Sequence, residues 1–136
     1  MKAMFLIPKD KFDCTTIESL LYANKDEVLS VKDELLEWIE DYNWPCAQAI
    51  LNVMAKRFVD FKELFEYAFK QYENKQLGIG VIRSILYIYY LIDDNRKSVW
   101  KHYEAHLLRI KEYPAQDEIA EGIYDNVLEI LEKTCG

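Results

Sequence analysis

The chain is poor in the residues that interrupt regular secondary structure. Its 136 residues include only four glycines and three prolines. Glycine and proline are the residues that most strongly mark turns and loops. Their scarcity therefore predicts long regular elements joined by short connections.

Cysteine is also scarce. Cys14, Cys46 and Cys135 are widely spaced and form no C-x-x-C pair. This pattern is more typical of a reducing compartment than of a disulfide framework. Cys46 follows Pro45 in the first turn of an expected helix, a position that can lower a thiol pKa. Because no histidine lies near it in sequence, we expect a buried, inert thiol.

Targeting and membrane-spanning segments are not evident. The apolar run at residues 4–7 is too short for a signal peptide. The longest apolar stretch, residues 79–92, is interrupted by Gly80, Arg83 and Ser84, so it falls short of a membrane span. These features predict a cytoplasmic protein without a membrane partner.

Positive charge is in deficit. The chain has 17 basic and 24 acidic residues, a net charge of −7. Binding to nucleic acid independently of sequence requires lysine and arginine to neutralise phosphates, so the acidity opposes it. Residues 112–132 hold seven acidic and no basic residues, and we expect this segment to be a solvated helix face.

Apolar residues recur at helical spacing along the whole chain. The expected helices begin near residues 28, 45, 61, 79, 97 and 115, after a shorter first helix that ends about Ala23. Spacings of 16 to 18 residues between these starts are typical of stacked helix pairs. We predict an all-α fold of about seven antiparallel helices in one domain, residues 1–136. A compact, irregular helical bundle is the alternative.

The sharpest local signal is the stretch Trp38-Ile39-Glu40-Asp41-Tyr42-Asn43-Trp44-Pro45. A residue before proline is pushed out of the α region, and proline suits the first turn of a helix. Asn43 tolerates the left-handed conformation that commonly ends a helix. We therefore predict a tight corner between two helices, with Trp44 packed back on Trp38 or Ile39.

This corner, with Ala47 after it, resembles the W-L-x-D-M-N-W-P-x-A signature of a family of small bacterial proteins. The family is classified only as a domain of unknown function. The opening Ile7-Pro8-Lys9-Asp10-Lys11-Phe12-Asp13 is similar to the family's N-terminal segment. Tyr42 stands where the family usually has Met. The resemblance implies a HEAT-like α-α superhelix and supplies no catalytic residue.

Two groups of polar residues are candidate sites. If the N-terminal segment folds over the first helices, Lys9, Lys11 and Asp13 meet Asp41, Asn43 and Trp44 at the corner, where they would bind a ligand or a partner. In the simpler interpretation, a lysine pairs with Asp41, and Asp41 and Asn43 cap helix ends.

The second group is His102 and His106, which lie at i and i+4 on one helical face and would share a zinc ion if a third ligand joined them. Glu104 is not at the position that the H-E-x-x-H motif requires. We expect two solvent-facing histidines, and therefore no metal.

The functional prediction is a non-catalytic protein-binding module that needs no cofactor. An immunity or adaptor protein is its more specific form, because small acidic proteins suit the capture of basic partners. One alternative is an enzyme with a metal-dependent or lysine/carboxylate site. The other is a HEAT-like nucleic-acid binder, which the acidity opposes. The sequence indicates no oligomeric state.

Overall fold

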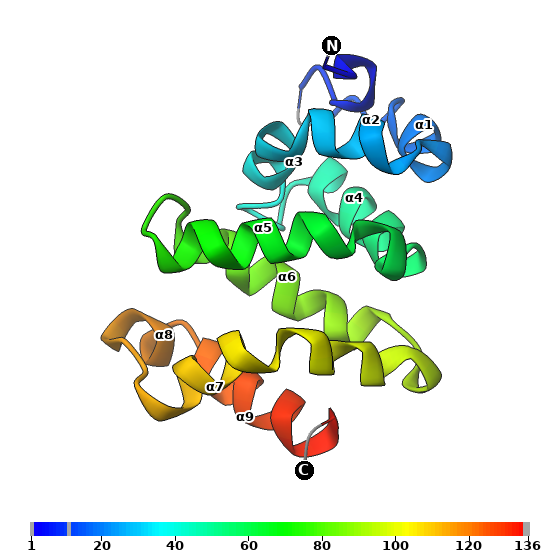
Figure 1. Ribbon diagram of the computed structural model, residues 1–136. Helices are drawn as coiled ribbons and strands as arrows, with labels where there is room; N and C mark the ends of the chain where they lie inside the picture. Colours follow the sequence, from blue (N-terminus) through cyan, green and yellow to red (C-terminus); the bar gives the residue numbers. More distant parts are fainter. Residues whose placement is uncertain (1, 11, 135–136) are drawn as a thin grey trace.

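The computed structural model describes residues 2–10 and 12–134, and this part of the chain is all-α (Figure 1). It contains α-helices and short 3-10 segments and no strand, which confirms the predicted class. The α-helices are α1 (Ile17–Tyr22), α2 (Lys25–Ser30), α3 (Lys32–Trp38), α4 (Pro45–Lys56), α5 (Lys62–Glu73), α6 (Ile79–Leu91), α7 (Glu104–Glu112), α8 (Gln116–Ala120) and α9 (Ile123–Thr134). The 3-10 segments are η1 (Met4–Leu6), η2 (Phe58–Phe61) and η3 (Asp94–Tyr103).

The helices follow one another through the molecule in chain order. Figure 1 shows α1 to α3 near the N-terminus, α4 to α6 in the middle, and α7 to α9 near the C-terminus. Helix α4 packs on α1 and α6, and α6 also contacts α5 and α9. The apolar α6 is therefore central, since a helix that is apolar nearly all round has to be covered on most sides.

Several expected helices are divided in the structure. The second expected helix is split at Val31, where φ is −121°. The last is split at Gly122, whose φ of +78° is a left-handed conformation that glycine adopts without a steric penalty. The first half of the sixth is the 3-10 segment η3. The prediction of about seven helices was therefore too low for the described residues.

The corner at Pro45 forms as the sequence predicts. Trp44 is extended, Pro45 is the first residue of α4, and the rings of Trp38 and Trp44 meet edge to face at 5.4 Å. One detail was wrong, because Asn43 is not left-handed. Helix α3 ends at Trp38, and in the described part of the chain Lys75 is the only non-glycine residue with positive φ.

The backbone just before the corner lies close against the start of α6. The Ser84 hydroxyl donates a hydrogen bond to the Ile39 carbonyl oxygen. A Cβ on Gly80 would lie 2.5 Å from the Glu40 carbonyl oxygen, a distance at which the backbone would have to move. Glycine at position 80 thus lets the chain before the corner pack directly on the central helix.

Side-chain capping differs between the first two helices. Asn24 and Glu27 form a reciprocal capping box at α2. Helix α1 follows Thr16, whose side chain makes no capping hydrogen bond. The hydroxyl of Thr15, one residue earlier, donates to Asp13 Oδ1 at 2.7 Å.

The core is rich in aromatic side chains. Trp100, Tyr89 and Tyr103 are its largest fully buried residues, and Phe58 lies against Trp100 with ring centroids 5.3 Å apart. In the described ranges, no helix is long and apolar enough to cross a bilayer.

Candidate functional site

The N-terminal segment before α1, residues 2–10 and 12–16 (hereafter the lead-in), folds over the first helices. Leu6 is fully buried, and the Ala3 backbone N–H donates to Ser30 Oγ at 2.9 Å. A disulfide joins Cys14 to Cys46, the second residue of α4. The lead-in is therefore attached to the corner, as the first candidate site requires.

This disulfide corrects the expectation for the cysteines. Cys14 and Cys46 are bonded to each other, and Cys46 is fully buried, so it is not a free thiol. Their separation of 32 positions in the sequence gave no spacing signal. Cys135 lies outside the described residues. The cysteines therefore no longer support a cytoplasmic location.

The predicted polar residues lie at this end of the molecule but are mostly engaged in local turns. Asp13 accepts from the Thr15 backbone N–H and hydroxyl, and these bonds hold its pKa below the usual value. Asp41 accepts from the Asn43 N–H at 3.0 Å, which is an Asx turn. No ion pair joins Lys9 to Asp41 in the described structure, and Lys11 lies outside the described residues.

Trp44 is the predicted site residue that lines a groove. The groove has a volume of about 280 Å³ and is lined by three apolar side chains and two glutamates. Its lining residues, Ile7, Glu34, Glu37, Trp38 and Trp44, come from the lead-in, α3 and the corner. We call it the tryptophan groove.

The two carboxylates of the tryptophan groove differ in their partners. Glu34 accepts from the Lys2 ammonium at 2.6 Å, and this bond lowers the Glu34 pKa. Glu37 is exposed and makes no ion pair with any described residue. Trp44, which lies beside them, is 38% exposed. The groove thus offers aromatic faces and one uncompensated negative charge.

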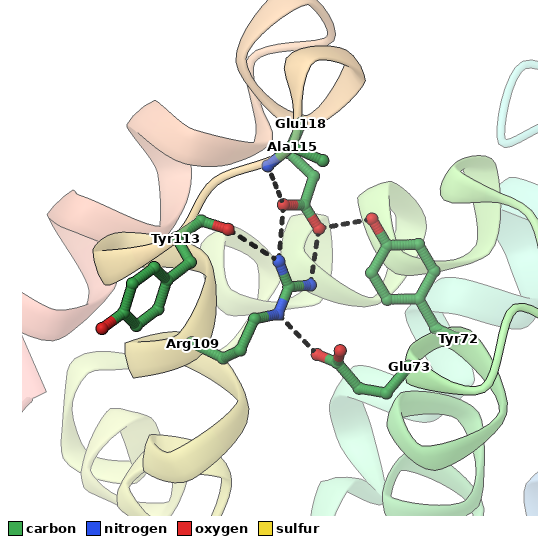
Figure 2. Close-up of polar contacts among 6 residues, drawn as sticks. All are labelled: Tyr72, Glu73, Arg109, Tyr113, Ala115 and Glu118. Carbon is green, nitrogen blue, oxygen red and sulfur yellow. Dashed lines mark hydrogen bonds and ion pairs between the residues drawn. The ribbon is translucent and has the colours of Figure 1, made fainter.

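A second, larger cleft of about 450 Å³ lies where α5, α7 and the start of α8 meet. Figure 2 shows the polar contacts among the side chains at this place. Arg109 on α7 binds Glu118 on α8 with two parallel hydrogen bonds of 2.8 and 2.7 Å. Its Nε donates to Glu73 at 3.1 Å. Glu118 also accepts from Tyr72 Oη at 2.5 Å and from the Ala115 backbone N–H at 2.8 Å. We call this set the arginine cluster.

The electrostatics of the arginine cluster favour its charged state. Burial alone would raise the Glu118 pKa, but the hydrogen bonds from Arg109, Tyr72 and Ala115 outweigh it and hold the pKa below its usual value. The bond to Glu118 raises the Arg109 pKa, and burial together with the bond to Glu118 raises the Tyr72 pKa.

The arginine cluster has the chemistry of a structural support. Glu118 is only 1% exposed, and each of its oxygens is hydrogen-bonded within the cluster. The Tyr113 carbonyl accepts a further bond from Arg109 at 3.3 Å, as Figure 2 shows. The cluster therefore fixes α7 and α8 against α5.

The two histidines have separate partners. His102 Nε2 lies 2.9 Å from Glu66 Oε1, whereas the His106 ring stacks on Phe69 with centroids 5.0 Å apart. Burial lowers the His106 pKa. Within residues 2–10 and 12–134, no three His, Cys, Asp or Glu side chains gather where they could hold a metal ion.

Several of these residues were not predicted as site residues. Glu34, Glu37 and Trp38 follow one another at helical spacing on α3, which is a signal that sequence reasoning could have used. Ile7 reaches the groove only because the lead-in folds back. The arginine cluster joins three helices and has no sequence motif.

These features define a class, a small all-helical protein with a disulfide-linked N-terminal segment. The chain belongs to the family described as domain of unknown function DUF5071, whose model matches residues 6–131. Searches of curated proteins and of solved structures found no match.

Proposed function

We propose that this protein is a non-catalytic protein-binding module with a HEAT-like arrangement of helices. The packing supports the arrangement, since α4 contacts α1 and α6, and α6 contacts α9, as expected when each layer packs on its neighbours along the chain. The resemblance of the Trp-Pro corner points the same way.

The observation that carries the binding function is the exposure of large apolar side chains on the lead-in and the corner. Met4 is 50% exposed, Phe5 57%, Phe12 74% and Trp44 38%. Aromatic and methionine side chains are enriched at protein interfaces, where they supply much of the binding energy. Their placement on segments joined by the disulfide supports a contact surface here.

Charge supports a basic partner, the specificity expected of an immunity or adaptor protein. At −7 the chain would attract a cationic protein and would repel nucleic acid and anionic membranes. The larger cleft adds little to a catalytic alternative, because the side chains of the arginine cluster are paired with one another. In the tryptophan groove, Glu34 is likewise paired, with Lys2.

The test is affinity capture from a lysate of the organism that encodes the chain, with three proteins as bait. These are the wild type, the double variant Met4→Ser/Phe5→Ser, and the control Tyr113→Ser. Tyr113 is 76% exposed but lies far along the chain, between α7 and α8. We expect one protein at equal stoichiometry with wild type and control, released by high salt, and lost with the double variant.

Equal capture by all three baits would contradict the proposed contact surface, because the partner would then bind elsewhere. A wild-type protein that elutes as a clean monomer with no partner would contradict the binding function itself.

A further inference from the structure

We infer that the tryptophan groove receives a lysine or arginine side chain from a basic segment of the partner. This inference rests on the proposed function and names the chemistry of the partner. The apolar lining of the groove is Ile7 with the edge-to-face pair Trp38 and Trp44. Cations bind favourably over tryptophan faces, and the aliphatic stem of a long basic side chain packs on apolar surface.

The carboxylates supply the complementary charge. Glu37 makes no ion pair with any described residue, and it lines the groove beside Trp38. Residues 33–55 contain five acidic residues and no lysine or arginine. Lys2 and Lys32 act on Glu34, so Glu37 is the groove carboxylate left to attract a cation and to repel an acidic or phosphorylated segment.

The chain itself shows the kind of contact expected. Lys2 places its ammonium 2.6 Å from Glu34, one of the two groove carboxylates. Lys2 remains well exposed, so the contact can be exchanged for one from a partner. A basic side chain from a partner would either use Glu37 alone or displace Lys2 from Glu34.

The size of the groove limits what it can hold. Its volume of about 280 Å³ lies just below the range of small-molecule pockets, which span roughly 300–1,000 Å³. One long side chain fits this space, and a folded element does not. The occupant is therefore a single arginine or lysine within an exposed basic segment.

The test is isothermal titration of the purified full chain, with its disulfide intact, by a capped hexa-arginine peptide at low salt. We compare the wild type with Trp44→Ala, Glu37→Gln and Lys2→Ala, and with the control Glu112→Gln. Glu112 belongs to the more acidic segment 112–132, so its variant reports attraction by charge in general. Circular dichroism checks that each variant is folded.

We expect Trp44→Ala to weaken binding about fivefold or more, the effect of removing a cation–π contact of about 1 kcal/mol. Glu37→Gln should weaken it severalfold, and Glu112→Gln should leave it within about twofold. Lys2→Ala should strengthen binding, because it frees Glu34.

The inference is overturned if the peptide does not bind, or if Trp44→Ala and Glu37→Gln bind it as the wild type does. It also fails if Glu112→Gln weakens binding as much as Glu37→Gln. A partner captured through Met4 and Phe5 that ignores the groove variants would preserve the proposed function and refute this inference. Peptide binding in the groove without any captured partner would support the preference of the groove for a basic side chain and would refute the proposed function.

Discussion

The tryptophan groove and the arginine cluster use charged residues in opposite ways. In the arginine cluster, a carboxylate that is only 1% exposed is surrounded by donors from α5, α7 and the backbone before α8. In the tryptophan groove, the lead-in is held by a covalent bond and a buried leucine, and the carboxylate of Glu37 stays open to solvent.

The difference separates stability from recognition. A polar group that is fully paired within the molecule stabilises a particular packing and has little left for a ligand. A region that is held together by a disulfide and apolar contacts can leave its aromatic and acidic side chains available. The smaller groove is therefore the better candidate for binding, although the arginine cluster lines the larger cleft.

The largest effect is expected when the disulfide that holds the lead-in is removed. The double variant Cys14→Ser/Cys46→Ser should lower the free energy of unfolding by about 3–4 kcal/mol, the range expected for a loop of this length. Urea unfolding measures the loss, and Cys135→Ser is the control for removal of a cysteine as such. An unchanged unfolding midpoint would show that the lead-in is held by its apolar contacts alone.

The sequence predicted the parts of the fold that depend on local sterics and hydrophobic pattern. Pro45 fixes the start of α4 through its own ring, and the apolar stretch that begins at Ile79 needs cover on most sides wherever it packs. The break at Gly122 was missed because a glycine inside a helical pattern does not by itself show whether φ is positive.

Both sites depend on contacts between distant segments, and this is why the sequence predicted them poorly. Tyr72 and Glu118 are 46 residues apart, and no local pattern connects them. Cys14 and Cys46 pair only because the lead-in folds back over α3 and the corner. Trp44 was predicted correctly as a corner residue because its neighbour Pro45 constrains it directly.

A smaller loss of stability is expected when Arg109 is removed from the arginine cluster. Arg109→Ala leaves Glu118 buried with Tyr72 and one backbone N–H as donors. Loss of one partner of a buried ion pair costs about 3–5 kcal/mol, and the partial exposure of Arg109 reduces this to about 2–3 kcal/mol. Thermal and urea unfolding measure it.

The matched control for Arg109→Ala is Lys25→Ala, which breaks an exposed pair with Glu63 at 3.8 Å and should cost less than about 0.5 kcal/mol. Binding of the hexa-arginine peptide should be unchanged in Arg109→Ala, since the tryptophan groove lies on other helices. Equal losses of stability in the two variants would remove the distinction between a structural cluster and a surface pair.

The smallest expected effect is on the pH dependence of stability. The folded-state pKa of Glu118 lies below the usual carboxyl value of 4.5, so its contribution to stability is complete above that pH and is lost as the pH falls through the folded-state pKa. Glu118→Gln should therefore be less stable than the wild type at neutral pH and should lose less stability below pH 4.5. Urea unfolding of Glu118→Gln and the wild type over a pH series tests this, and parallel curves for the two proteins would show that the buried carboxylate is not the group that titrates.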